Sequence, residues 1–379
     1  MKIIRRAALL FLNIALFTSH LTAQETTLSG LQRKLFQTEI DGNYVDLFTL
    51  TNKNGMEVCI TNYGGRVVSV MVPDKDGKME DVVCGFPSIQ DYRELRQNFG
   101  AAIGRYIGRI LNARFSLDSV EYKLSGAKHC AHGGYPGFAD RVWSPRQEDP
   151  QTLHLYYLSP DGENGFPGNL NVHLIYKLTD DNALDIIYEA TTDKPTVVNL
   201  SHHSFFNISG DLSSSVENAY LQIDSDYITE YDEEKCVTGA FLPVKNTPFD
   251  FNEPKRIGED IHEPDKQLKI TNGYDHTWVL NTNGDDTCVA VRLTDPESGR
   301  ILEVCTTEPG IQIYTANGLN GKTIGKNGVA YPFRGAVCFE TLHFADSPNK
   351  PQFPSTTLRP GDTYYSHTVY KFGTVNSKK

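Results

Sequence analysis

Residues 171–178 read NVHLIYKL, a stretch in which every second residue, from Val172 to Leu178, is apolar. A period of two is typical of a β-strand with one buried face, because successive side chains point to opposite faces. The same alternation returns in residues 184–190, LDIIYEA, and again in residues 364–372 near the C-terminus. These stretches predict antiparallel β-strands.

Turn signals separate further strand-like stretches along the chain. Residues 115–122 read as a β-hairpin whose two-residue turn is Asp118-Ser119. Residues 289–293 and 302–306 read as neighbouring strands, with the turn cluster DPESG between them. The β pattern therefore extends well beyond residues 171–190.

Helical patterns are short and few. Residues 88–97 and parts of 254–265 are the best candidates, and no stretch carries a long apolar stripe at helical spacing. The expected fold class is all-β, a large antiparallel β-sandwich. Because we find no Pro-, Ser- or Gly-rich hinge and no repeat period, we expect residues 24–379 to form one domain.

The composition fits a large folded core and excludes several classes of protein. The chain has 379 residues, of which 39% are hydrophobic, so it is neither disordered nor collagen-like. With 36 basic and 47 acidic residues, the net charge is −11, and there is no basic run. This charge argues against nucleic acid as a partner.

Residues 1–23 have the pattern of a secretory signal peptide. Three basic residues precede an apolar stretch at 7–17, and small residues lead to a cleavage position before Gln24. The apolar stretch is much shorter than the roughly 20 residues that a spanning helix needs, so we expect no stable membrane span. We therefore expect an exported protein, located in the bacterial periplasm.

The seven cysteines are thinly spread, and the absence of a C-x-x-C pair argues against a zinc knuckle or a redox motif. We expect most of them to be buried free thiols, among them Cys59, Cys288, Cys305 and Cys338, which lie in apolar strand-like stretches. A single disulfide in an oxidising compartment stays open. The sequence has no H-x-H or H-E-x-x-H spacing, so no metal ligands are predicted.

Some polar residues lie beside glycines, where they could contact a ligand. Arg105 and Arg109 lie four apart in GRYIGRI. We expect at least one to have a structural role, whereas the forked donors of an arginine could also bind sugar hydroxyls. His132 precedes Gly133-Gly134, where the backbone can approach another group closely or adopt a positive φ.

Other polar residues lie within strand-like stretches. In a strand, His202 and His203 would point to opposite faces, so only one could enter a given pocket. Asp275, beside a tyrosine and near a tryptophan, fits either a sugar site or a turn that leads into a strand. Glu340 is the strongest signal, because a carboxylate inside the apolar stretch 336–344 is unusual unless it is paired or functional. Burial would raise its pKa and make it a competent base near neutral pH.

Taken together, these motifs are similar to those of the aldose 1-epimerases, the galactose mutarotase family. The resemblance covers nearly the whole mature chain, from NYGG at 62–65 to YKF at 370–372. Its most specific parts are NLSHHSFFN at 199–207, EPGIQIYT at 308–315, ETLHFADSPN at 340–349 and FPS at 353–355. The resemblance implies a supersandwich fold and an isomerase that interconverts the α and β anomers of free hexoses such as galactose and glucose.

The resemblance also implies roles for six residues. His203 matches the catalytic histidine and Glu340 the catalytic carboxylate. The sugar-binding positions are matched by Arg109, His132, Asp275 and Gln312. Ring opening needs a proton delivered to the ring oxygen and another removed from the anomeric hydroxyl, which a protonated histidine and a carboxylate can do together.

This chemistry needs no cofactor, and the expected partner is a small monosaccharide bound by a monomer or dimer. Some relatives carry calcium, so a structural calcium ion is possible in this family. The acidic loop Asp161–Asn164 could hold one, although an ordinary solvated turn is the more common use of such a loop.

Three positions depart from the family pattern. Gly108 stands where an asparagine usually precedes the binding arginine, and His202 where an asparagine usually precedes the catalytic histidine. Leu342 replaces a glutamine two residues after Glu340, which makes the surroundings of this carboxyl more apolar and should raise its pKa. The departures leave the sugar preference open.

Three other functions stay open as alternatives. An epimerase for a sugar phosphate or another sugar would use the same fold, but a phosphate needs extra basic residues at the pocket mouth. A non-catalytic carbohydrate-binding protein could share the fold as well. A glycoside hydrolase or lyase would need two opposed carboxylates, for which Asp275 and Glu340 are candidates.

Overall fold

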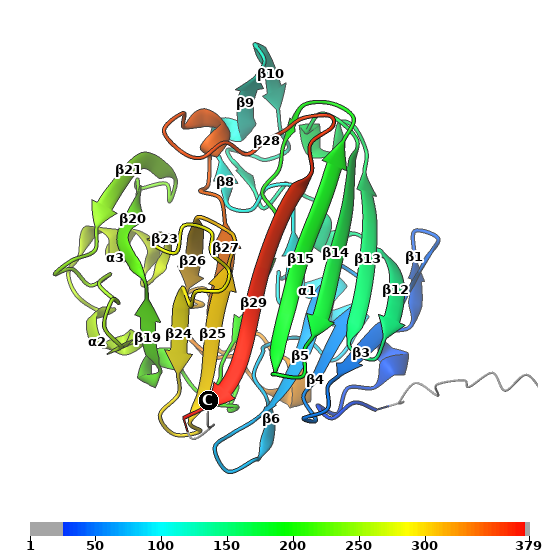
Figure 1. Ribbon diagram of the computed structural model, residues 1–379, viewed down its shortest axis with the longest axis vertical. Coiled ribbons are helices and arrows are strands. Elements are labelled where there is room, and N and C mark those ends of the chain that lie inside the picture. The colour runs from blue at the N-terminus through cyan, green and yellow to red at the C-terminus, as the bar shows by residue number, and fades with distance from the viewer. Residues whose placement is uncertain (1–25, 376–379) are drawn as a thin grey trace, which may run out of the picture.

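The computed structural model describes residues 26–375, so the predicted signal peptide at 1–23 lies outside the described residues. Three antiparallel sheets form the body of the molecule, and the largest has nine strands (Figure 1). In spatial order these strands are β12 (Ser144–Asp149), β13 (Thr152–Ser159), β14 (Leu170–Leu178), β15 (Ala183–Thr192), β29 (Tyr364–Thr374), β25 (Arg300–Thr306), β24 (Val291–Thr294), β19 (Tyr220–Ile223) and β22 (Lys255–Arg256).

Two smaller sheets pack against the nine-stranded sheet. The six-stranded sheet has the order β18 (Phe205–Phe206), β27 (Val337–Leu342), β26 (Gly310–Tyr314), β23 (Asp275–Leu280), β20 (Ser225–Tyr231) and β21 (Val237–Pro243). The four-stranded sheet has the order β3 (Leu47–Thr51), β4 (Glu57–Thr61), β5 (Arg66–Pro73) and β6 (Met79–Asp81).

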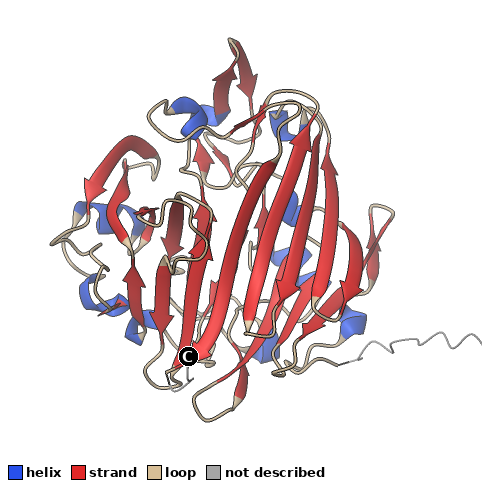
Figure 2. Ribbon diagram, in the orientation of Figure 1, coloured by secondary structure: helices blue, strands red, loops and turns tan. Residues whose placement is uncertain are grey.

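Short two-stranded pairs complete the fold. They are β1 (Thr38–Ile40) with β2 (Asn43–Val45), β7 (Ala101–Ile103) with β17 (Ser201–His203), β8 (Arg109–Ile110) with β11 (Cys130–Ala131), β9 (Arg114–Leu117) with β10 (Val120–Lys123), and β16 (Thr196–Val197) with β28 (Thr357–Leu358). Helices are short and peripheral (Figure 2): α1 (Ile89–Leu95), α2 (Ile257–Asp260) and α3 (Lys266–Thr271). The predicted all-β sandwich is confirmed.

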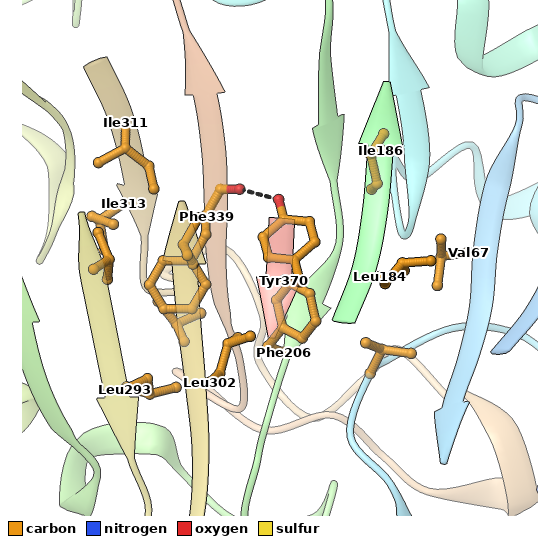
Figure 3. Close-up of a cluster of buried hydrophobic side chains, with 14 of the residues drawn as sticks. Val67, Leu184, Ile186, Phe206, Leu293, Leu302, Ile311, Ile313, Phe339 and Tyr370 are labelled. Carbon is orange, nitrogen blue, oxygen red and sulfur yellow. Dashed lines mark hydrogen bonds between the residues drawn. The ribbon is translucent and has the colours of Figure 1, made fainter. Parts of the chain in front are cut away.

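The main core lies between the sheets and explains the alternation in the sequence. Along β14 the residues at 170, 172, 174, 176 and 178 are buried, whereas those between them are half-buried or exposed. Figure 3 shows where side chains of different sheets meet, including Tyr370 of β29, Phe206 of β18 and Phe339 of β27. The Tyr370 hydroxyl donates a hydrogen bond of 2.6 Å to the Phe339 carbonyl, so the phenol joins two sheets without leaving a buried polar atom unpaired.

Most predicted elements are confirmed, with some differences at their ends. Asp118 and Ser119 form the predicted hairpin turn, and both have positive φ, as a type I′ turn requires. Helix α1 lies within the predicted 88–97 range and begins after Ser88, whose side chain accepts a hydrogen bond from the Asp91 N–H. Helix α2 lies within the predicted 254–265 range. Helix α3 was not predicted, because its single turn and a half is too short to show a periodic pattern.

One cysteine prediction is wrong. Cys288 is exposed rather than buried, since residues before Val291 form a turn in which its N–H donates to the Asp285 carbonyl. Cys305 is half-buried on β25, while Cys59 and Cys338 are buried as expected. All seven cysteines are free thiols. Among the described residues, no helix is long and apolar enough to cross a membrane.

Candidate active site

All six residues predicted to form the site line one cavity of about 490 Å³. The six-stranded sheet supplies three of them through its strand register. Gln312 on β26 lies directly opposite Glu340 on β27, and Asp275 on β23 lies opposite Tyr314, two residues along β26. Because residues i and i+2 share a face of a strand, this register places Asp275, Gln312 and Glu340 at the same end of the cavity wall.

His203 reaches the cavity from β17, at the junction between the small β7–β17 pair and the six-stranded sheet. His202 and His203 point to opposite faces, as predicted: His203 lines the cavity, and the ring of His202 packs edge-on against core residue Tyr176. The ring of Phe205 stacks on that of His203, with centroids 5.0 Å apart and planes 10° apart. This stacking fixes the orientation of the imidazole without a hydrogen bond.

His203 and Glu340 form a close pair. The Nε2 atom of His203 lies 3.5 Å from Oε1 of Glu340, and both side chains are more than nine-tenths buried. Burial raises the pKa of Glu340 well above its usual value, and the charge of Asp275 adds to this effect. Burial lowers the pKa of His203 well below its usual value, with further contributions from His132 and His202. Both shifts disfavour charge, so burial favours a neutral imidazole beside a carboxylic acid.

Asp275 is held by a chain of hydrogen bonds that passes through Gln312. The Gln312 amide donates from Nε2 to Oδ1 of Asp275 over 2.7 Å. Its Oε1 accepts from the hydroxyls of Thr277 at 2.6 Å and Tyr231 at 3.2 Å. Both acceptor sites of the amide oxygen and one N–H are thus occupied, so Gln312 orients Asp275 and keeps its second N–H for a ligand. Burial raises the pKa of Asp275, while Gln312, Arg109 and Lys235 partly offset this effect.

The β8–β11 pair supplies the opposite wall of the cavity. Arg109 lies opposite Ala131 in this pair, which places it beside His132, the next residue along the chain. Arg109 donates from Nη1 to the Lys235 carbonyl over 3.2 Å. Gly133 follows with φ +80°, and a Cβ atom there would lie 2.1 Å from the Gly104 carbonyl oxygen, so the predicted close backbone approach is confirmed.

His132 is a half-buried imidazole at the cavity wall. No described residue accepts from or donates to its Nδ1 atom, and its ring centroid lies 5.6 Å from that of His203. Burial and the charge of Arg109 lower the pKa of His132 to about 4. His132 is therefore neutral near pH 7 and suited to exchange hydrogen bonds with a bound hydroxyl.

The departures from the family pattern change one side of the cavity. Gly108 and Leu342 both line it, and Leu342 is buried in an apolar cluster with Ile103 and Ile107. Gly108 has φ +76°, and a Cβ atom there would lie 2.9 Å from the Cβ of Ala345. The wall next to Glu340 is therefore apolar, which agrees with the raised pKa of that carboxyl.

Arg105 has a structural role, as one of the two arginines was expected to have. Its guanidinium is buried and donates to the carbonyls of Ser159, Pro160 and Pro167, away from the cavity. The acidic loop that could hold calcium already has ion-pair partners.

In that loop, the carboxylate of Asp161 pairs with Lys194, and that of Glu163 pairs with Arg141. A calcium ion bound by this loop would have to displace both cations.

The cavity contains residues that sequence reasoning missed. Tyr314 could have been found, because it lies two residues from Gln312 on the same face of its strand. Thr277 does not line the cavity, but it lies two residues from Asp275 and donates to Gln312. Tyr231 is the last residue of β20 and Lys235 lies in the turn that leads to β21, and no sequence pattern signals their approach. Lys235 is a second cation at the Asp275 end of the cavity.

Comparison with known proteins identifies the family of this chain. The aldose 1-epimerase family profile matches residues 46–371. Galactose mutarotase from Mus musculus is 38% identical over 333 residues, which cover 87% of this chain and 95% of the relative. Aldose 1-epimerase from Escherichia coli (strain K12) is 36% identical over 336 residues, which cover 88% of this chain and 96% of that protein.

Solved structures lead to the same family. An aldose epimerase homologue from C. elegans superimposes with a TM-score of 0.81 at 28% identity, covering 88% of this chain and all of that one. Galactose 1-epimerase from Lactobacillus acidophilus NCFM gives a TM-score of 0.78 at 30% identity, covering 89% and 97% of the two chains. The chain therefore belongs to the aldose 1-epimerase family and is an isomerase.

Proposed function

We propose that the protein interconverts the α and β anomers of free aldohexoses, galactose and glucose among them, and that His203 and Glu340 carry out the proton transfers. The observation that carries the proposal is the separation of 3.5 Å between Nε2 of His203 and Oε1 of Glu340 at the wall of a sugar-sized cavity. The relatives named galactose mutarotase and galactose 1-epimerase support the choice of substrate.

The pair works with one shared proton. In the reacting form, Glu340 is a carboxylate that takes the proton of the anomeric hydroxyl, and His203 is an imidazolium that gives a proton to the ring oxygen. The C1–O5 bond breaks, and the products are the open aldehyde with a neutral imidazole and a carboxylic acid. After the aldehyde turns about the C1–C2 bond, the two groups exchange roles and the ring closes on the other face.

The resting state of the cavity fits this cycle. The neutral pair that burial favours has the same number of protons as the ion pair, so neither a cofactor nor solvent has to supply a proton. Hydrogen bonds from sugar hydroxyls would stabilise the charged form when the substrate binds. General acid–base catalysis of this kind accounts for about 10²–10⁴ in rate for each well-placed group.

The other residues bind and orient the sugar. Asp275, fixed by Gln312, accepts hydrogen bonds from hydroxyls, while Arg109 and neutral His132 contact the sugar from the opposite wall. Charged hydrogen-bond partners on both sides hold the ring so that its C1–O5 bond lies beside the catalytic pair.

Polarimetry tests the proposal. Freshly dissolved α-galactose and α-glucose should reach anomeric equilibrium faster with the wild-type protein, and Glu340→Ala should remove nearly all of the added rate. No acceleration for any free aldose would contradict the proposal, and binding without acceleration would indicate a carbohydrate-binding protein. Faster reaction of glucose 6-phosphate than of galactose would favour the sugar-phosphate alternative. Release of reducing sugar from oligosaccharides would favour a hydrolase.

We also propose that residues 1–23 direct export to the periplasm and are then removed. The proposal rests on the basic start, the apolar stretch and the small residues before Gln24. N-terminal sequencing of the protein from the periplasmic fraction should give a chain that begins at Gln24. Recovery of the full-length chain from the cytoplasmic fraction alone would contradict it.

A further inference from the structure

A third ligating side chain lies beside the catalytic pair. Cys338 is two residues before Glu340 on β27 and therefore lies on the same face of the strand. One ligating atom from each of His203, Cys338 and Glu340 lies within 4.8 Å of the other two. Cys338 is fully buried and does not line the cavity, so its thiol lies behind the pair rather than in contact with a bound sugar.

We propose that His203, Cys338 and Glu340 bind a divalent zinc-class ion, and that this ion inhibits the enzyme by occupying the catalytic pair. Imidazole, thiolate and carboxylate are the ligands that zinc takes in proteins, and three of them with one open position form the arrangement of an accessible zinc site. The open position here faces the cavity, where water completes the coordination and the bound ion excludes the sugar.

The distances suit such an ion. With bonds of about 2.0–2.1 Å to nitrogen or oxygen and about 2.3 Å to sulfur, neighbouring ligand atoms of a tetrahedral ion lie about 3.3–3.6 Å apart. The separation of 3.5 Å between His203 and Glu340 is already in this range. The sulfur of Cys338 already lies within 4.8 Å of the other two ligand atoms, so a short movement brings it into the range of a bound ion.

The chemistry selects the class of metal. A thiolate and an imidazole favour Zn²⁺, Co²⁺ or Cd²⁺ over Mg²⁺ and Ca²⁺, which prefer oxygen ligands. Binding forms bonds from the metal to the sulfur of Cys338, to an oxygen of Glu340 and to a ring nitrogen of neutral His203, and the ion releases bound waters in exchange. The protons of the Cys338 thiol and of the Glu340 carboxylic acid pass to the solvent. The step changes no oxidation state, so it needs no other reactant.

The site is built for exchange rather than for permanent binding. A zinc-bound histidine normally donates its other ring nitrogen to a carboxylate or carbonyl, and loss of this contact weakens binding about 10–100-fold. The Nδ1 atom of His203 has no hydrogen-bond partner among the described residues, because stacking on Phe205 fixes the ring instead. We therefore expect reversible inhibition that a chelator removes.

The binding test uses Co²⁺ as a spectroscopic probe. Cys288 and Cys305 reach the surface and could bind metal by themselves, so the full-length double variant Cys288→Ser/Cys305→Ser serves as the background. CoCl₂ should produce a thiolate-to-cobalt absorption band in this background, and the band should disappear when Cys338→Ser is added. The absence of the band in the background would overturn the proposal.

The inhibition test uses the same background with ZnCl₂ and galactose. Zinc should compete with the sugar, EDTA should restore the rate, and MgCl₂ should have no effect. Cys338→Ala should need at least about tenfold more zinc for half inhibition, with a rate in the absence of zinc within about threefold of the background. Equal inhibition of both proteins would overturn the proposal.

Only the inhibition test of this proposal rests on the proposed function, because the cobalt test measures metal binding directly. Two outcomes distinguish failure of this proposal from failure of the proposed function. If both Cys338 variants fail to fold by circular dichroism, the cobalt band in the background decides alone, in favour if present and against if absent. If the protein has no mutarotase activity, the proposed function fails, and the cobalt spectrum still tests the metal site.

Discussion

The cavity and the outer face of the nine-stranded sheet both hold a histidine next to carboxylates, yet the two settings move the pKa of the histidine in opposite directions. His203 in the cavity has its pKa lowered by burial, with one partner at 3.5 Å and an Nδ1 atom without a hydrogen bond. His367 on β29 has its pKa raised by Asp185 at 3.7 Å and Asp286 at 2.7 Å.

The difference shows where the fold leaves groups free to react. On the outer face the carboxylates are close enough to stabilise the charged imidazole, and water reaches the group. In the cavity, desolvation outweighs the attraction of the single carboxyl, so His203 can give up a proton readily.

The largest effect should separate these two histidines directly. His203→Ala should lower kcat/KM for galactose by about 10³–10⁴, because it removes one of the two proton-transfer groups. The matched variant His367→Ala should leave kcat/KM within about twofold. Polarimetry measures both, and near-wild-type activity of His203→Ala would show that His203 has been assigned the wrong role.

The second effect concerns how Gln312 holds the carboxylate of Asp275 in the cavity. Gln312→Leu removes the donor to Asp275 and leaves this half-buried carboxylate without its partner, at a cost of about 1–3 kcal/mol. We expect kcat/KM to fall about tenfold or more, mainly through a higher KM. Gln222→Leu, which removes a similar amide bonded to the Asn252 carbonyl outside the cavity, is the control. An unchanged KM in Gln312→Leu would mean that Asp275 does not need Gln312 for orientation.

The third effect is the pH dependence of the reaction. Because the pKa of Glu340 is raised above its ordinary 4.5, the pair loses its last proton only at a pH above that value. Because the pKa of His203 is lowered below its ordinary 6.5, the pair takes up a second proton only at a pH below that value. The singly protonated pair therefore exists over a wide interval, and kcat/KM should form a broad plateau between an acid limb and an alkaline limb.

Leu342→Gln sharpens this test. A polar side chain beside Glu340 should stabilise its carboxylate, lower its pKa and move the alkaline limb to lower pH, by about one unit or less. Leu342→Met keeps the wall apolar and should leave the limb in place. If the limb does not move in Leu342→Gln, the apolar wall is not what raises the pKa of Glu340.

The smallest effect belongs to the outer face. Since the folded-state pKa of His367 is raised, its ion pairs stabilise the fold below the unfolded pKa of about 6.5, and this contribution is lost as the pH rises through the folded pKa. His367 is partly exposed, so we expect less than about 1 kcal/mol. Urea unfolding should show a larger gap between wild type and His367→Gln at pH 6 than at pH 9. An equal gap at both values would contradict the prediction.

The long strands could be predicted from the sequence because they have a buried and an open face. Strands β14, β15 and β29 follow the period-two pattern over their whole length. The short pairs β7–β17 and β8–β11 could not be predicted, because two or three residues show no period. These short pairs place His203 and Arg109, so the part of the fold that builds the cavity is the part with the weakest pattern.

The candidate site was predictable for a different reason. Glu340 stood out by itself, as a carboxylate inside an apolar strand, whereas Arg109 and His132 were assigned through the resemblance to the family. Tyr231, which holds Gln312, could not be assigned, because its approach depends on the register of the β20–β21 hairpin. The register between distant strands depends on how whole sheets pack, and a local sequence pattern carries no information about that packing.

Gly108 also constrains how this protein could have diverged from its relatives. An asparagine tolerates the positive φ at this position, but its Cβ would lie 2.9 Å from the Cβ of Ala345. Return to the family's asparagine therefore requires Ala345→Gly or a shift of its backbone at the same time. The order of substitutions matters: toward asparagine the first step without a clash is Ala345→Gly, whereas in the opposite direction the asparagine at 108 has to become glycine before alanine enters at 345. An ancestral series that restores both positions would measure this dependence as a non-additive effect on sugar preference.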